Sequence, residues 1–202
     1  MTTKEKILTE ALRQLNENGV DNVTVRSVAK AIGISHGNLC YHFPNTDAII
    51  HKLYLQLVDE FDAQIEQAEV PKSDLHLLFQ IGEANFKIQY GYKFLLLDFV
   101  QIMRRIPAVK EHFKNHIEIR RMQFKFILDS LVEGGILREE FEPNMYAHLI
   151  TRLLIFGNGW IAFSEIHTEG EVKPMKYFEV FGSALLPYLT EKGMEEYREL
   201  IK

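Results

Sequence analysis

Apolar residues recur at helical spacing along almost the whole chain, and this period constrains the fold more than any other feature. In the first segment, Ile7, Leu8, Ala11, Leu12 and Leu15 fall on one face of a helix. No short run alternates apolar and polar side chains between hairpin turns, which would be the pattern of a half-buried strand. The sequence therefore predicts an all-α protein.

Glycines and prolines divide this pattern into separate helices. Gly19, Gly33 and Pro44 are expected to end the first three helices, because glycine adopts a left-handed cap and proline cannot continue the hydrogen-bond ladder. The later helices are expected over residues 46–69, 73–90, 91–105, 107–134, 143–166, 173–189 and 191–201. The second and third of these could form one kinked helix. Pro107 and Pro143 are expected in the first turn of their helices.

The segment from Thr24 to Phe43 has the arrangement of a helix-turn-helix unit. A short helix is followed by a turn centred on Gly33 and by a second short helix that Ser35 can cap. Five apolar side chains can close a small core with the first helix of the chain: Val28, Ile32, Ile34, Leu39 and Phe43. The N-terminal end of the second short helix is the part that enters the major groove of DNA in this class of unit.

The outer face of that helix carries the residues that could contact DNA. The predicted DNA-binding residues are Thr24, Arg26, Ser35, His36, Gly37, Asn38, Tyr41 and His42. Asn38 can pair with adenine N6 and N7, and His36 can donate to guanine N7 or O6. Gly37 lets the backbone approach the groove closely. Phosphate contacts are expected from Thr24, Arg26, Tyr41 and His42. The alternative is that such residues only cap or solvate helices, as Thr24 could.

This segment resembles the DNA-binding domain of the TetR family of bacterial repressors. The resemblance covers roughly residues 4–50 and depends on the spacing of Thr24, Ala29, Gly33, Ser35, Leu39, Tyr41, His42 and Phe43. It implies a three-helix helix-turn-helix domain over residues 1–46 and a helical ligand-binding and dimerisation domain over residues 47–202. It also implies a repressor that a small apolar or amphipathic effector releases from a pseudo-palindromic operator of double-stranded DNA.

Three positions depart from the family pattern. His36 stands where a basic residue is frequent, Cys40 where an aromatic residue is common, and Thr46 where a lysine usually meets a phosphate. Each departure removes a positive charge or a contact surface. The alternative function is therefore a helical dimerising module that binds a ligand or a protein and has lost DNA binding.

The charge distribution bears on the same question. The net charge of the chain is −5, yet residues 1–50 hold five basic and five acidic residues, so the acidity belongs to the remainder. Because the DNA-facing part is neutral, its affinity for DNA is expected to depend on a few direct contacts rather than on overall electrostatic attraction. With two histidines on it, binding is expected to strengthen as the pH falls toward about 6.5.

The middle helices are rich in aromatic residues and methionine, which suits a cavity for an apolar or amphipathic effector. The predicted ligand-binding residues are Phe86, Tyr90, Phe94, Asp98, Phe99, Met103, Arg121 and Phe124. Asp98 lies in an apolar run, so a pair with Arg120 or Arg121 is expected, either as structure or as a polar anchor for the ligand. Ordinary core packing is the alternative for each aromatic residue.

The last two long helices are expected to form a homodimer. The predicted interface residues are Leu149, Leu153, Phe156, Gly157, Trp160, Phe178, Phe181, Gly182 and Leu185. Glycine costs about 1 kcal/mol inside a helix, and the close approach of a second helix would compensate. Two such helices from each chain would make a four-helix bundle that presents two recognition helices to the operator. The alternative is that these helices complete the core of a monomer.

Other chemistries have weak support. His112 and His116 have metal-ligand spacing on a helix, but without a third ligand a solvated face is expected, and no metal or cofactor. No Gly-rich phosphate loop, HExxH or GxSxG sequence occurs, so the chain is not expected to be an enzyme. The single Cys40 is expected to be a small packing residue. No secretory signal and no apolar run of about 20 residues is present, so a cytoplasmic protein without a membrane partner is expected.

Overall fold

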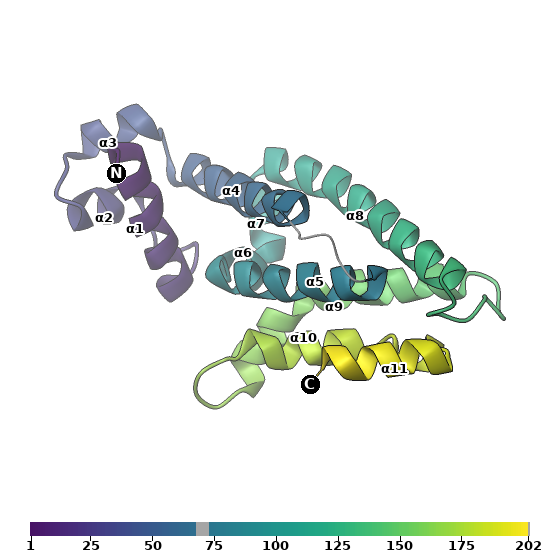
Figure 1. Cartoon of the computed structure of the whole chain (residues 1–202). Coiled ribbons are helices and arrows are strands. Elements are labelled where there is room, and N and C mark those ends of the chain that lie inside the picture. Colours follow the sequence, from purple (N-terminus) through teal and green to yellow (C-terminus); the bar gives the residue numbers. More distant parts are fainter. Residues whose placement is uncertain (68–72, 202) are drawn as a thin grey trace. The chain divides into compact units, whose positions relative to one another are not determined.

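The computed structural model describes residues 1–67 and 73–201, and most of these residues are helical (Figure 1). The elements are α1 (Thr3–Asn18), α2 (Val25–Ala31), α3 (His36–His42), α4 (Thr46–Gln67), α5 (Asp74–Gly91), α6 (Phe94–Leu97), α7 (Phe99–Arg105), α8 (Pro107–Glu133), α9 (Met145–His167), α10 (Pro174–Ser183), the 3₁₀ turn η1 (Leu186–Tyr188) and α11 (Glu191–Leu200). No strand occurs in the described part, where Leu137 and Leu189 form an isolated antiparallel bridge. The all-α prediction is confirmed.

The chain forms two compact units. The first unit holds Met1–Glu60 and Gly91–Phe113, and the second unit holds Phe61–Tyr90 and Lys114–Lys202. Helices α4 and α8 each contribute residues to both units. The predicted division of the chain between residues 46 and 47 remains a prediction.

Local signals set the helix ends in the first unit. The Thr2 side chain accepts a hydrogen bond from the main chain of Glu5, whose carboxylate bonds back to Thr2, and this capping box starts α1. Gly19 ends α1 with a φ of +75°. Asn45 Oδ1 accepts from the main chain of Ala48 at 2.9 Å and begins α4. The expected end of α4 at residue 69 lies outside the described residues.

Three expected helix boundaries are wrong. The segment 91–105 is two helices, because the chain turns at Asp98 between α6 and α7, and a separate turn divides α5 from α6. Pro143 lies in the turn before α9, whose first residue is Met145. The segment 173–189 ends as an α-helix at Ser183, because Pro187 has no N–H and its ring would collide with the carbonyl four residues earlier.

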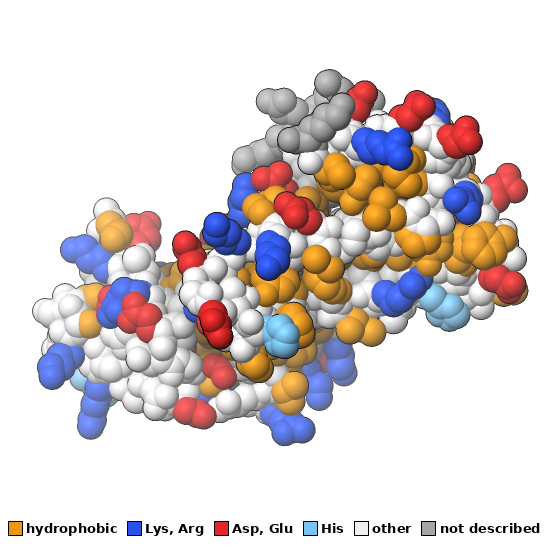
Figure 2. Space-filling view, turned by 90° about the horizontal axis from the view of Figure 1, so that it is seen from below, with side chains coloured by type: hydrophobic (Ala, Val, Ile, Leu, Met, Phe, Trp, Pro, Cys, Tyr) orange, Lys and Arg blue, Asp and Glu red, His pale blue; other side chains and the backbone are white. Residues whose placement is uncertain are grey.

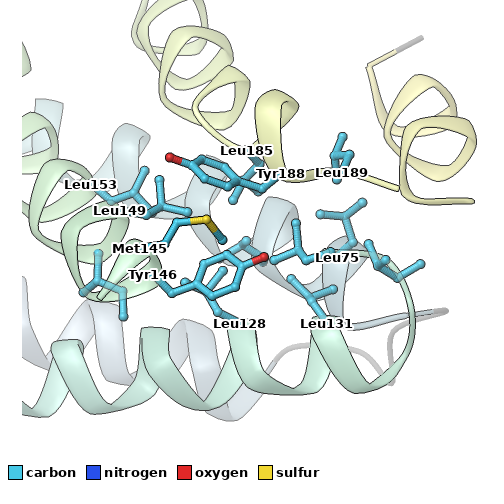
Figure 3. Close-up of a cluster of buried hydrophobic side chains, with 14 of the residues drawn as sticks. Leu75, Leu128, Leu131, Met145, Tyr146, Leu149, Leu153, Leu185, Tyr188 and Leu189 are labelled. Atoms are coloured by element: carbon cyan, nitrogen blue, oxygen red, sulfur yellow. The ribbon is translucent and has the colours of Figure 1, made fainter. Parts of the chain in front are cut away.

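The core of the second unit is formed mainly by leucines and tyrosines from five elements (Figure 3). Its labelled residues are Leu75, Leu128, Leu131, Met145, Tyr146, Leu149, Leu153, Leu185, Tyr188 and Leu189. The hydroxyl of Tyr146 donates a hydrogen bond to the carbonyl of Arg138 at 2.6 Å, so this polar group of the core has a partner. Burial raises the pKa of this tyrosine to about 12.

Helix α9 is long and apolar enough, by length and composition alone, to cross a membrane, and it is the one such helix among the described residues. The central helix of a globular core passes the same test. Here Leu149, Leu153, Trp160 and Ile161 are buried inside the chain, which accounts for the apolar character of the helix.

Candidate DNA-binding and effector sites

The helix-turn-helix unit is held by a small apolar core. Val28 and Leu39 are fully buried, and Phe43 is nearly so. Gly33 takes a φ of +71° between α2 and α3, a left-handed conformation that glycine adopts without strain. The predicted turn is confirmed, while Ile32 and Ile34 are half-buried rather than buried.

Two of the predicted DNA-binding residues also cap the helices of this unit. Thr24 Oγ1 accepts from the main chain of Ser27 at 3.1 Å, and Ser35 Oγ accepts from the main chain of Asn38 at 3.1 Å. Ser27 in turn donates to Gln14 of α1 at 2.7 Å, which ties α2 to α1. These two hydroxyl groups cap the first turns of α2 and α3. No other side chain on the outer face of α3 is needed for capping.

The remaining predicted contacts share the outer surface of the unit. The exposed residues among them are Arg26, His36, Gly37, Asn38 and Tyr41, and His42 is half-buried. Tyr41 is 85% exposed, an unusual position for so large a side chain unless a partner covers it. Their contact with DNA remains a prediction.

The structure shows the neighbours of the three positions that depart from the family pattern. Cys40 Sγ lies 3.5 Å from His36 Nε2 on the preceding turn of α3. Thr46 is buried at the start of α4. The next residue, Asp47, pairs with Arg105 of α7 at 2.6 Å.

Hydrogen bonds join α1 and α4 to residues 91–113 within the first unit. Asn16 of α1 donates to the carbonyl of Gly91 at 2.8 Å and accepts from the main chain of Phe94 at 3.1 Å. The hydroxyl of Tyr54 on α4 shares a 3.0 Å hydrogen bond with His112 of α8, and burial raises the pKa of this tyrosine to about 12. Residues 91–113 therefore hold both α1 and α4 through hydrogen bonds.

Asp98 has a different partner from the one expected. Its Oδ2 accepts from the main chain of Val20 at 3.0 Å, just after α1, so its carboxylate stabilises the end of that helix rather than an arginine. Arg121 instead donates to Thr151 Oγ1 of α9 at 3.1 Å, and Arg120 pairs with Asp62 at 2.9 Å. The predicted Asp98–arginine pair is therefore wrong.

The eight predicted ligand-binding residues are divided between the units. Phe94, Asp98, Phe99 and Met103 belong to the first unit, and Phe86, Tyr90, Arg121 and Phe124 to the second. An open surface hollow is lined by Val100, Gln101, Arg104 and Arg105 of α7 and contains none of the eight. Ligand contact by these residues remains a prediction.

Predicted ligand and dimer residues of the second unit meet in one aromatic cluster. Phe86 stacks on Trp160 with ring centroids 4.9 Å apart, and Trp160 Nε1 donates to Gln89 at 2.6 Å. Phe178 and Phe181 meet Phe86 edge-on. The sequence predicts functional roles for these aromatic residues, but it divides them between a ligand-binding site and a dimer interface.

Most of the predicted dimer residues are covered by their own chain. The buried ones are Leu149, Leu153, Trp160, Phe178, Gly182 and Leu185, and Phe156, Gly157 and Phe181 are half-buried. A Cβ on Gly182 would lie 2.9 Å from the Phe79 ring, and one on Gly82 would lie 2.5 Å from the Phe178 ring. The close approach that Gly182 allows is therefore between α10 and α5 of one chain. The sequence does not predict this pairing, because Gly82 carries no periodic signal.

The two histidines with metal-ligand spacing have separate partners. His112 bonds Tyr54, and His116 accepts from Arg120 Nε at 3.1 Å. Within the described residues, no group of three or more His, Cys, Asp or Glu side chains could hold a metal ion.

An N-terminal helix-turn-helix with an exposed second helix defines the chain as a helix-turn-helix transcription regulator. It belongs to the TetR family: the model described as bacterial regulatory proteins of the tetR family matches residues 7–53, and the one described as bacterial transcriptional repressor matches residues 54–197. Its relatives are transcription regulators, which implies a role other than catalysis.

Individual relatives are distant but cover most of the chain. The chain is 24% identical to the regulator UidR of Escherichia coli K12 over 157 residues, 76% of each chain, and 21% identical to the repressor KstR2 of Mycobacterium tuberculosis H37Rv over 193 residues, 94% of each. The structure of a TetR-family regulator from Marinobacter aquaeolei VT8 superposes with a TM-score of 0.86 at 22% identity, covering 99% of this chain and 97% of that one. KstR2 superposes with a TM-score of 0.66 at 16% identity, covering 94% and 96%. These structural similarities establish the fold.

Proposed function

We propose that this protein is a cytoplasmic transcriptional repressor that leaves its operator when a small apolar or amphipathic effector binds the second unit. The exposed face of α3, with Asn38 and Tyr41 directed to solvent, is the observation that carries the DNA-binding role. Among the relatives, KstR2 is named as a repressor. Asn38 reads bases in this proposal, and Tyr41 and Arg26 hold phosphates.

Space beside the buried face of α9 supports an effector site. Gly157 lies one turn from Leu153 and one turn from Ile161, both of which are buried. A Cβ on Gly157 would nevertheless meet no atom within 4 Å. An apolar effector could occupy that space, bounded by the aromatic cluster on the same helix.

Release from DNA would follow from a shift between two conformations. Helix α4 begins next to α3 and ends in the second unit, so it can transmit a change from one unit to the other. The effector must bind the conformation with low DNA affinity more tightly than the other one, because equal affinity would shift nothing.

Binding to DNA upstream of the protein's own gene tests this function. We expect a mobility shift that weakens as salt rises and is reversed by an extract fraction containing the effector. The absence of a salt-sensitive shift with any genomic fragment would instead favour a helical module that has lost DNA binding.

A second copy of the chain is the partner we propose for the exposed apolar face of α9 and α10. Hydrophobic side chains reach the surface of the molecule, as the face drawn in Figure 2 shows, and on these two helices the exposed ones are Ile155, Phe163, Ile166 and Val180. Gly159 lies one turn from both Ile155 and Phe163, and a Cβ there would meet nothing within 4 Å, so a partner helix can approach closely.

Replacing Phe163 by lysine is expected to weaken dimerisation at least tenfold, since the side chain is 56% exposed in the single chain and would be covered in the dimer. Sedimentation equilibrium at micromolar concentration measures this. Phe126→Lys is the matched control, because Phe126 is 74% exposed on α8. A dimer that resists Phe163→Lys, or one that only Phe126→Lys disrupts, would place the interface elsewhere.

A further inference from the structure

Helix α8 carries an arginine whose charge is largely buried. The Arg120 side chain is 13% exposed, and its guanidinium lies 5.9 Å from the centroid of the Phe61 ring. It donates to Asp62 Oδ1 at 2.9 Å, to Gln123 Oε1 at 2.8 Å and to His116 Nε2 at 3.1 Å. We refer to these five residues as the Arg120 cluster, and all of them belong to the second unit.

The carboxylate that pairs with Arg120 is held much less firmly than the arginine. Burial lowers the pKa of Arg120, because desolvation disfavours its charged form, and Asp62 opposes this effect. A buried guanidinium therefore needs a negative partner at all times. The Asp62 side chain, by contrast, is 55% exposed. Asp62 can return to water at little cost if another carboxylate takes its place.

The guanidinium also has unused capacity for hydrogen bonds. Within the described residues, the contacts of the Arg120 cluster engage three of the N–H groups of Arg120. Arginine has about five such groups in a planar fork, which matches the two oxygens of a carboxylate. An incoming acid could thus be bound by two parallel hydrogen bonds.

We infer that the effector is an organic acid: an apolar molecule whose carboxylate binds Arg120 in place of Asp62. One negative charge replaces another, so the buried guanidinium stays paired throughout. Because Asp62 lies on α4, its displacement removes an ion pair that ties α4 to α8. This inference rests on the proposed function, since it names the chemical class of the effector that releases the repressor.

The test uses a panel of straight-chain and aryl-substituted carboxylates, each beside the alcohol with the same skeleton. Trp160, the one tryptophan of the chain, reports binding by its fluorescence because it lies in the aromatic cluster, and calorimetry gives the affinity. We expect at least one acid to bind about tenfold or more tightly than its alcohol. Arg120→Gln should remove this preference while leaving the affinity for the alcohol unchanged.

Two further variants keep the test decisive if Arg120→Gln does not fold. Asp62→Asn removes the competing carboxylate, so it should raise the affinity for the acid several-fold and leave that for the alcohol unchanged. Lys125→Gln is the control, because Lys125 lies on α8 in an exposed ion pair with Asp129 and should keep the wild-type preference.

The inference is overturned if no acid on the panel is preferred to its alcohol, or if the preference survives in Arg120→Gln and is unaltered in Asp62→Asn. Its failure can be told apart from failure of the proposed function. A protein that shifts DNA but shows no preference for acids is a repressor with another class of effector. A protein with an Arg120-dependent preference and no affinity for DNA has the acid site but is not a repressor.

Discussion

Replacing Asn38 by alanine is expected to lower the affinity for the operator about 10- to 100-fold while leaving the affinity for unrelated DNA unchanged. An asparagine that pairs with adenine contributes about 1 to 3 kcal/mol of discrimination. The substitution should not disturb α3, because the hydrogen bond from residue 38 to Ser35 Oγ uses the main-chain N–H. Fluorescence anisotropy with the operator and with a scrambled duplex at one salt concentration measures both affinities.

The contrasting variant is Tyr41→Phe, which removes the hydroxyl expected to meet a phosphate. It should weaken operator and scrambled DNA alike, because phosphate contacts carry no base preference. Asn22→Ala is a matched control, since Asn22 bonds only the preceding turn through Asn18 and lies outside α3. If Tyr41→Phe changed base preference and Asn38→Ala did not, the two roles would have to be exchanged.

Replacing Gly193 by alanine is expected to lower the free energy of unfolding by about 3 kcal/mol. A methyl group at this position of α11 would overlap the carbonyl oxygen of Ile136. That oxygen cannot move freely, because it accepts from the main chain of Thr190 at 3.0 Å and the next residue forms the Leu137–Leu189 bridge. Overpacking against main chain of this kind typically costs about 1 to 3 kcal/mol, and here no flexible side chain can yield.

Thermal unfolding measures this effect, with an expected fall in Tm of about 6 to 12 °C for a chain of this size. Gly91→Ala is the control, because a Cβ at Gly91 would meet nothing within 4 Å. The control should be neutral or stabilising by up to about 1 kcal/mol, as alanine is the better helix former. A Gly193→Ala protein as stable as the wild type would mean that α11 does not pack against residue 136.

The helix-turn-helix could be predicted because its signals are local. Thr24 and Ser35 cap their helices through residues only three positions away, and Gly33 makes its turn by its own backbone freedom. Each of these features works within a few residues, so it can be read from adjacent letters. The residues on the outer face of α3 could also be predicted, because helical spacing over a few adjacent residues determines which of them face outward.

The partners of the polar side chains could not be predicted in this way. Asp98 bonds the main chain 78 positions earlier, at Val20, and Arg120 pairs with Asp62 across 58 positions. Both groups were recognised as charges that need a partner, yet several partners of the right sign or type were available. Only the packing of the helices selects among them.

The sequence by itself determined that the chain is helical, where most of its helices end, and which short helix faces outward in the N-terminal unit. The tertiary structure alone decided which side of α9 is covered: Leu153 and Trp160 are buried while Ile155 and Phe163 are exposed, although all four are apolar. It also decided that Gly182 receives Phe79 of its own chain. The physical reason is that helical periodicity predicts that an apolar face will be buried, whereas the choice among several apolar faces depends on the shape of the neighbouring helices.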